Sequence, residues 1–211
     1  MLEARGLRKS YRGAGGVLDP VSFALEPGEC LGVAGTNGSG KSTLLRLIAQ
    51  AEKPDAGQVL FRGRDVSGWR DFPRRRLGYV PQALELAAEL TAGEQLALWR
   101  AACGQRGGVS EELTELLGLR PLLPRRIGTL SGGMQRRVSL AMALSKGRDV
   151  LVLDEATAGL DESYREGLLT WMTAFLARGG CAVWCTHLDD ELERLCTSCM
   201  TLREGRPFWG R

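Results

Sequence analysis

Alternating apolar positions predict β-strands near the start of the chain. Val21, Phe23 and Leu25 fall on one face of an extended segment. The polar stretch EPGE at 26–29 predicts a turn, and the apolar run CLGVAG at 30–35 follows it. We therefore expect antiparallel strands that lead into a buried strand.

The pattern changes to a helical period after residue 43. In the segment LLRLIAQ, the apolar residues Leu44, Leu45, Ile48 and Ala49 occupy one face of a helix. The glycine-rich stretch GTNGSGKST at 35–43 therefore joins a strand to a helix.

A helical segment is expected from about residue 84 to 127, where Leu, Ala and Glu dominate. Thr91 and Glu94 have the spacing of a capping box at the start of one helix. Residues 110–117 predict a second helix that ends before Gly118.

Apolar strands return in the last third of the chain. The run DVLVLDE at 149–155 is typical of a parallel sheet that is covered on both faces. A helix near 162–177, the strand CAVWCTH at 181–187 and a hairpin around Glu204 and Gly205 are expected to follow.

These elements predict an α/β fold in one domain over residues 1–211. Residues 1–82 and 128–211 are expected to form an α/β core with a parallel sheet and an N-terminal antiparallel β subdomain. Residues 83–127 are expected to form an inserted helical subdomain.

Composition restricts the partners of the chain. It has 44% hydrophobic and 25% charged residues, and its net charge of +3 is too small to require a nucleic-acid partner. The longest purely apolar runs are five residues, against the ~20 that cross a bilayer. We expect a soluble chain without a secretory signal that can dock onto a membrane protein.

Six cysteines raise the question of disulfides or zinc. Cys181 and Cys185 would lie about 13 Å apart on one strand, which suits core packing and excludes a bond between them. Cys196 and Cys199 have the C-x2-C spacing of half a zinc site, but a second half is missing. Free thiols in a reducing cytoplasm are the expectation.

The stretch at 35–43 matches the phosphate-binding pattern G-x4-G-K-[ST] between a strand and a helix. Its glycines let backbone N–H groups turn toward phosphate oxygens, and the helix that follows presents its positive end. We expect Lys41 to meet the β and γ phosphates, Ser42 to ligate Mg²⁺ and Thr43 to meet the α phosphate. The predicted nucleotide-binding residues of this loop are Gly35, Asn37, Gly38, Ser39, Gly40, Lys41, Ser42 and Thr43.

Two carboxylates stand at the end of the buried strand 149–155, where ligands bind in open parallel sheets. Because neighbouring strand residues point in opposite directions, we expect Asp154 to hold Mg²⁺ and Glu155 to polarise the attacking water. Alone, such a pair would often be a solvated turn. Small G-proteins read guanine with an Asn-Lys-x-Asp motif. The sole asparagine of this chain, Asn37, lies inside the phosphate loop, so that motif is missing and a GTPase of this kind is excluded.

The stretch LSGGMQ at 130–135 contains the sequence Ser-Gly-Gly. Its Ser131 stands 23 positions before Asp154. Here the sequence resembles the ATP-binding cassette (ABC) family, whose signature is Leu-Ser-Gly-Gly-Gln or a close variant. Ser131 can cap a helix that begins near Met134. The resemblance implies a P-loop NTPase (RecA-like) core and a head-to-tail dimer, in which Ser131, Gly132 and Gly133 act on ATP held by the partner subunit.

Further motifs resemble this family in the expected order. Tyr11 matches the aromatic that stacks on adenine, and Gln82, after the hinge residue Pro81, matches the glutamine that touches Mg²⁺ or the water. AGLD at 158–161 resembles the loop that crosses the dimer interface. His187 is similar to the switch histidine that contacts the γ phosphate. The sequence departs from the common pattern at Ala156, where proline is usual, which removes no ligand.

The resemblance implies an ATP-hydrolysing subunit with ATP and Mg²⁺ as cofactors, acting as a homodimer or heterodimer. Separate transmembrane permease subunits would hold it at the cytoplasmic face of the membrane. Ser131 follows Gln82 by only 49 positions, and this resembles compact exporters of the ABC-2 and haem-exporter kinds more than importers.

Two alternatives stay open: an importer cassette, and a soluble ABC ATPase that acts on nucleic acid or the ribosome. The basic clusters at 74–76, 125–126 and 136–137 lack the interleaved aromatics of a stacking surface, so we expect them to be solvated or to meet partner loops. No direct nucleic-acid contact is expected.

Overall fold

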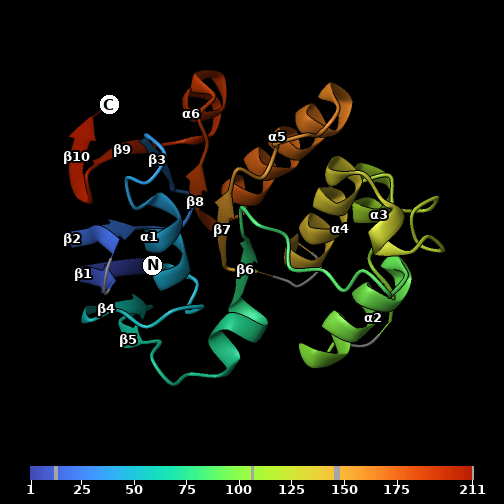
Figure 1. The fold of residues 1–211 in the computed structure, drawn as a ribbon, viewed down its shortest axis with the longest axis horizontal. Helices are drawn as coiled ribbons and strands as arrows, with labels where there is room; N and C mark the ends of the chain where they lie inside the picture. The colour runs from blue at the N-terminus through green and yellow to red at the C-terminus, as the bar shows by residue number, and fades with distance from the viewer. Residues whose placement is uncertain (12–13, 106, 145–147, 211) are drawn as a thin grey trace.

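A computed structural model describes residues 1–11, 14–105, 107–144 and 148–210. Its strands form two sheets (Figure 1). The first is antiparallel, with the order β2-β1-β4-β5. Its strands are β1 Leu2–Tyr11, β2 Ala14–Leu25, β4 Ala56–Phe61 and β5 Arg64–Asp65.

The second sheet has the order β10-β9-β3-β8-β7-β6 and is parallel except for its last hairpin. Its strands are β3 Cys30–Gly35, β6 Leu77–Val80, β7 Val150–Asp154, β8 Cys181–Cys185, β9 Ser198–Arg203 and β10 Arg206–Gly210. The expected hairpin is confirmed, because β9 and β10 turn at Glu204 and Gly205. The fold class is therefore α/β, as predicted.

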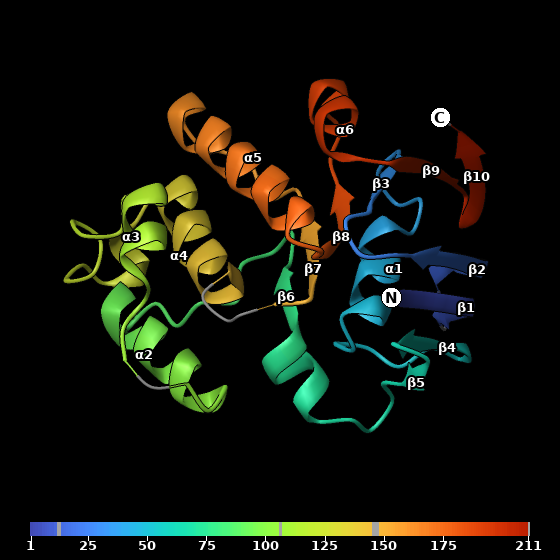
Figure 2. The ribbon, with the colours of Figure 1, turned by 180° about the vertical axis from the view of Figure 1, so that it is seen from behind.

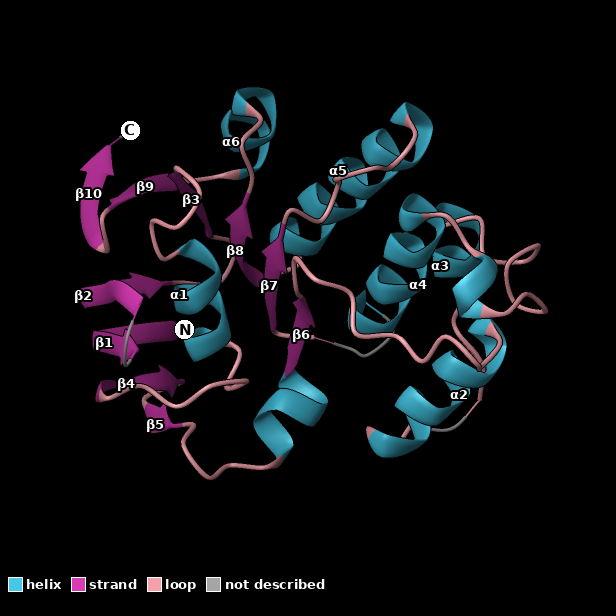
Figure 3. Cartoon of the chain, in the orientation of Figure 1, coloured by secondary structure: helices cyan, strands magenta, loops and turns pink. Residues whose placement is uncertain are grey.

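Helices cover the parallel sheet and extend away from it. They are α1 Lys41–Ile48, α2 Ala92–Ala102, α3 Glu111–Leu116, α4 Gly132–Leu144, α5 Glu162–Ala177 and α6 Asp189–Leu195. Two short turns, the π-helical turn Phe72–Arg76 and the 3₁₀ turn Ile127–Thr129, complete the described helical elements. Figure 3 shows α2, α3 and α4 together at one end, with no strand labelled among them.

Side chains cap α2 and α3, and the capping box of α2 is the one that the sequence predicted. The Thr91 hydroxyl accepts from the Glu94 N–H, and the Glu94 carboxylate accepts from the Thr91 N–H at 2.8 Å, which completes the capping box. Ser110 caps α3 through its hydroxyl, which accepts from the Leu113 N–H at 3.3 Å. Such caps each contribute on the order of 1 kcal/mol.

The parallel sheet separates two hydrophobic clusters. Val150 and Val152 of β7 face α1 and the antiparallel sheet, whereas Leu151 and Leu153 face the helices on the other side. Alternation of strand residues between two covered faces explains why the segment is apolar throughout.

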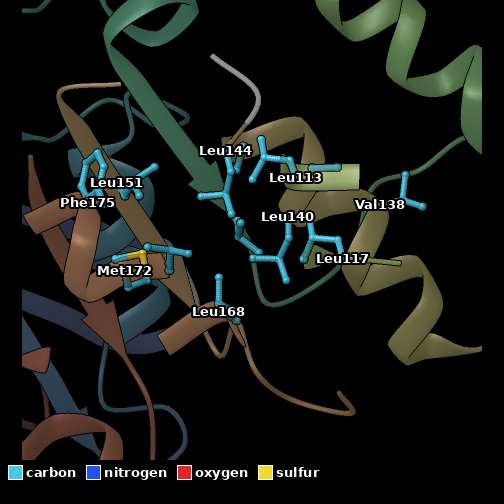
Figure 4. Packing of buried hydrophobic residues seen from close by; sticks show 14 of the residues in the cluster. Leu113, Leu117, Val138, Leu140, Leu144, Leu151, Leu168, Met172 and Phe175 are labelled. Carbon is cyan, nitrogen blue, oxygen red and sulfur yellow. The ribbon is translucent and has the colours of Figure 1, made fainter. Parts of the chain in front are cut away.

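The helical segment shares its core with the sheet. Leu113 and Leu117 belong to the same cluster as Leu140 of α4, Leu151 of β7 and Met172 of α5 (Figure 4). Burial of each such side chain stabilises the fold by roughly 1.5–3 kcal/mol. Helix α4 packs on both β6 and α2, and so joins the helical segment to the sheet.

Candidate functional site

The glycine-rich loop lies between β3 and α1, as the sequence predicted. Gly35 has φ 143°, and a Cβ at this position would lie 2.4 Å from the Leu202 carbonyl oxygen. Gly40, the residue before α1, has φ 103°. Both conformations are ones that L side chains rarely adopt, so glycine is required at these two turns.

Lys41 folds back over this loop. Its Nζ donates to the Gly35 carbonyl at 2.8 Å and to the Thr36 carbonyl at 3.1 Å. The ammonium is thereby held beside the backbone that curves toward α1. A cation in this place, next to the positive end of a helix, is suited to a polyphosphate.

Asp154 and Glu155 follow the buried strand β7, and both line the same pocket. Asp154 is 1% exposed, and its Oδ2 has no hydrogen-bond partner among the described residues. Strand alternation, from which this arrangement was predicted, does not produce it. The strand ends at Asp154, and Glu155 enters the left-handed region at φ 52° while its N–H donates to the Cys185 carbonyl at 3.0 Å.

His187 stands after β8 and meets Glu155. Its Nδ1 lies 2.9 Å from Glu155 Oε2, and the imidazole is largely exposed, at 72% of its surface. An ionised carboxylate only accepts hydrogen bonds, so with Glu155 ionised Nδ1 carries the hydrogen and a neutral ring keeps its lone pair on Nε2.

A pocket of about 220 Å³ collects most of the predicted residues. Its lining residues are Asn37, Gly38, Gly40, Lys41, Ser42, Thr43, Gln82, Asp154 and Glu155. The three predicted metal ligands converge there, and Ser42 Oγ lies 3.5 Å from Gln82 Oε1. Gly35 and the buried Ser39 support the loop from behind the lining.

Tyr11 lies beside this pocket and does not line it. Its hydroxyl donates to Glu52 Oε2 at 2.7 Å, accepts from Arg46 at 3.0 Å and is 3.5 Å from Thr43 Oγ1. Burial alone would raise the pKa of Glu52, but hydrogen bonds from Tyr11 and Arg46 outweigh it and lower that pKa. The tyrosine is therefore tied to the start of α1, and its stacking on adenine stays a prediction.

Three residues of the signature line another, smaller pocket of about 80 Å³. It is lined by Ser131, Gly133, Met134, Arg137, Gly159, Leu160, Asp161 and Tyr164. Within the described chain it shares no lining residue with the phosphate pocket. In Figures 1 and 2, which view the molecule from opposite sides, α1 lies beside the antiparallel strands, and α4 lies on the far side of β6 and β7.

Ser131 caps α4, as predicted, although the helix already begins at Gly132. The Met134 N–H donates to Ser131 Oγ at 3.3 Å. Gly133 touches the loop 158–161, because a Cβ there would lie 2.1 Å from the Gly159 carbonyl oxygen. A Cβ built on Gly132, by contrast, would meet nothing within 4 Å.

Sequence reasoning missed the part played by Arg136. Arg136 and Arg137 were expected to be solvated or to meet partner loops; they are not solvated, being only 8% and 7% exposed, and contact with partner loops stays a prediction. Arg136 donates to the Pro81 carbonyl at 2.9 Å and to the Gln82 carbonyl at 3.0 Å. The one sequence signal is its position between the signature and the apolar end of the same helix. Arg136 thus links α4 to Gln82, the residue whose side chain lies beside Ser42.

The buried cysteines agree with expectation. Cys181 and Cys185 are fully buried on β8. All six cysteines fall within the described residues and are free thiols. No group of three or more His, Cys, Asp or Glu side chains in that part of the chain has the arrangement of a metal site.

The fold and the pocket are those of a phosphate-loop nucleotide-binding protein. Residues 18–158 match the family described as ABC transporter. The chain therefore belongs to the ABC transporter family.

Relatives of the chain are exporter cassettes by name. It is 38% identical over 194 residues to the Nod factor export ATP-binding protein I of Burkholderia thailandensis, with 90% of this chain and 64% of that protein covered. The protein of the same name from Rhizobium etli is 37% identical over 202 residues, with 94% and 64% covered. The chain thus spans about 64% of the length of these relatives.

Solved structures agree along the whole chain. An ATP binding subunit of an ABC transporter superimposes with a TM-score of 0.86 at 29% identity, covering 100% of this chain and 89% of that one. The dimeric post-hydrolysis structure of the cassette MJ0796 bound to ADP and Pi gives a TM-score of 0.86 at 25% identity, with 100% and 99% covered. Among the described residues of this chain, no helix is long and apolar enough to cross a membrane.

Proposed function

We propose that this chain is the ATP-hydrolysing subunit of an exporter whose transmembrane subunits are separate polypeptides. The observation that carries the proposal is that the phosphate pocket and the signature pocket are separate on one chain; we call each of them a half-site. The phosphate pocket holds Lys41, Asp154 and Glu155, whereas Ser131 and Gly133 lie in another pocket. Only a second copy or a related subunit can bring the two half-sites together around one nucleotide.

ATP is the substrate that fits the phosphate pocket. Backbone N–H groups of the loop and the N-terminus of α1 would meet the β and γ phosphates. Lys41 would exchange its two carbonyl partners for phosphate oxygens, and Thr43 would meet the α phosphate. Tyr11, at the edge of this pocket, would receive the adenine on its ring face.

The residues present suit Mg²⁺, which prefers oxygen ligands. The orphaned Asp154 Oδ2, Ser42 Oγ and Gln82 Oε1 are three such oxygens in one pocket. Mg²⁺ held there would neutralise charge on the β and γ phosphates. An unpaired buried carboxylate oxygen is costly to keep, so a cation beside it explains why the position is acidic.

Glu155 and His187 are placed to act on water. Glu155 would accept a hydrogen bond from the attacking water, and the imidazole would hold the carboxylate in place through Nδ1. With Nδ1 on Glu155, the ring could bind the γ phosphate through Nε2 only in its imidazolium form, which carries hydrogen on both nitrogens. General-base assistance of this kind contributes typically 10² to 10⁴ in rate.

Ser131, Gly132 and Gly133 would close the site from the partner subunit. A serine hydroxyl and unhindered backbone amides at a helix N-terminus are suited to the γ phosphate. The contact between Gly133 and Gly159 joins this edge to the loop 158–161, which would run along the subunit interface.

Export is favoured over import by the relatives' names and by the compact segment between Gln82 and Ser131. We place the chain at the cytoplasmic face of a membrane, bound through its permease.

The direction of transport can be tested in cells that carry Glu155→Gln. If the protein exports, a compound that cells with the active protein release should be missing from the medium of the variant cells and should accumulate inside them. A compound left unused in the medium would instead indicate import.

The dimer model is tested by the mass of the purified protein in solution. Glu155→Gln should bind ATP without hydrolysing it and should therefore accumulate as a dimer of twice 22.9 kDa in ATP and Mg²⁺. Light scattering after gel filtration measures this mass. The double variant Lys41→Ala, Glu155→Gln is the control and should stay monomeric. A Glu155→Gln protein that binds ATP yet remains monomeric would contradict a site shared between two copies of this chain.

A further inference from the structure

Three thiols outside the ATP site meet at the amino end of β3. Cys30 is the first residue of β3, Cys196 is the residue that ends α6, and Cys199 lies on β9. The Cys30 and Cys196 Sγ atoms are 3.7 Å apart. Burial, followed by the neighbouring Cys196 thiol, raises the pKa of Cys199. Cys196 is thus the middle thiol of the cluster.

Gly32 makes room for these thiols on the sheet. A Cβ on Gly32 would lie 3.0 Å from Cys196 Sγ and 2.9 Å from Cys199 Sγ. Any side chain at this position of β3 would therefore push the sulfur atoms away. The cluster depends on a residue without a side chain directly beneath it.

The backbone holds Cys30 and Cys196 in place from both sides. Thr197, next to Cys196, donates its N–H to the Cys30 carbonyl at 2.9 Å, and the Cys30 N–H donates to Thr197 Oγ1 at 3.2 Å. The two sulfur atoms must approach by roughly 1.7 Å to reach a disulfide bond length of about 2.05 Å. Side-chain rotation can supply this movement while the paired backbones stay in position.

Accessibility differs within the pair. Cys30 is fully buried, whereas Cys196 is half-buried. The contact with Cys196, followed by burial, raises the pKa of Cys30 well above its usual range. An oxidant from solution therefore reaches Cys196 first, and Cys30 is the neighbour that reacts in the second step.

We propose that Cys30 and Cys196 form a reversible disulfide when the protein meets a peroxide. The Cys196 thiolate attacks a peroxide oxygen of H₂O₂ and becomes a sulfenic acid as hydroxide leaves. The Cys30 sulfur then attacks Cys196 Sγ, and the second hydroxide leaves as water with the Cys30 proton. Two thiols are oxidised by two electrons, and one H₂O₂ is reduced to two waters.

The position of this bond predicts its effect. Cys30 and Gly35 stand at opposite ends of β3, five residues and so about 17 Å apart. The bond would join β3 to the end of α6, across 166 positions of sequence, without entering the phosphate pocket. It should therefore raise the stability of the folded chain and leave ATP hydrolysis nearly unchanged. This inference does not depend on the proposed transport function.

The test uses the full chain and the Cys199→Ser variant, which keeps the proposed pair and removes its neighbour. Each protein is treated with H₂O₂, quenched, alkylated with N-ethylmaleimide under denaturing conditions and mapped without reduction. We expect two fewer alkylated thiols, a Cys30–Cys196 cross-linked peptide and reversal by dithiothreitol. The melting temperature of oxidised Cys199→Ser should rise by about 5 °C or more, and its ATPase rate should stay within about twofold.

Cys30→Ser and Cys196→Ser are the matched negative variants and should yield no such peptide. A Cys196–Cys199 bond in the wild-type chain, or full alkylation of all thiols after peroxide, would overturn the proposal. Purified protein that retains zinc and whose thiols resist peroxide until the metal is chelated would also overturn it, in favour of a metal site.

Discussion

Glu155 illustrates how one backbone conformation builds the site. At φ 52° it leaves the line of β7, so that it and Asp154 line one pocket instead of facing opposite sides of the sheet. A non-glycine residue in this region costs of order 1–3 kcal/mol. The bond from the Glu155 N–H to Cys185 and the contact with His187 hold it there. Local strain is thus used to aim a carboxylate.

The two signature glycines should behave differently when changed to alanine. In Gly133→Ala the new methyl group would overlap the Gly159 carbonyl oxygen, and overpacking of this kind costs typically 1–3 kcal/mol. We expect a lower melting temperature and a weaker ATP-dependent dimer. Gly132→Ala is the control, since its Cβ meets open space and the fold should keep its stability. Thermal denaturation of both variants without nucleotide measures the difference. Equal stability of the two would show that α4 and the loop 158–161 are not packed as described.

At the scale of elements, a buried charge pair joins α5, α6 and β8. Glu191 of α6 is fully buried, and its carboxylate accepts from Arg165 of α5 at 2.9 Å. It also accepts from the Trp184 indole N–H at 3.1 Å. Helix α6 begins two residues after His187, and α5 begins directly after the loop 158–161. The pair therefore connects the loop 158–161 to the loop that carries His187.

Removal of Glu191 should destabilise the fold strongly. Glu191→Ala leaves the Trp184 N–H and part of the Arg165 guanidinium unpaired, and loss of one partner in a buried pair costs about 3–5 kcal/mol. We expect about 3 kcal/mol, because Arg165 keeps Glu162 at 3.2 Å and the exposed Asp190. The free energy of unfolding in urea measures this loss.

Asp190→Ala is the matched control for that experiment. Asp190 contacts the same guanidinium at the surface, where ion pairs contribute about 0–1 kcal/mol. A similar loss from both variants would mean that burial of Glu191 adds nothing to the pair.

At the scale of the whole molecule, local signals predicted much of the fold. The Thr91 capping box, the helix that follows Ser110 and the turn at Glu204 depend on residues close in sequence, and all are present. The phosphate loop was equally visible, because its glycines and lysine are consecutive.

Long-range packing could not be read from the sequence in the same way. The pairing of β1 with β4, the burial of Arg136 and the thiols beside Gly32 each join segments far apart in the chain. Period and composition describe one segment at a time, so they cannot specify which segments meet. Arg136 shows the consequence, since its two Nη atoms donate to carbonyls 55 and 54 positions away in the chain.

Nucleotide and metal should stabilise the molecule as a whole, because they bind only the folded chain. Saturation at about 100 times the dissociation constant adds about 2.7 kcal/mol to the free energy of unfolding. We expect a higher melting temperature with ATP and EDTA, and a further increase with ATP and Mg²⁺. In Asp154→Asn the first increase should remain, because Lys41 and the loop amides are intact. The second should be lost, because the orphaned carboxylate oxygen that fits the metal is gone. Lys41→Ala should lose both. If Asp154→Asn kept the full Mg²⁺-dependent increase, the metal would be held by other oxygens of the pocket, and the buried, unpaired Oδ2 would need another explanation.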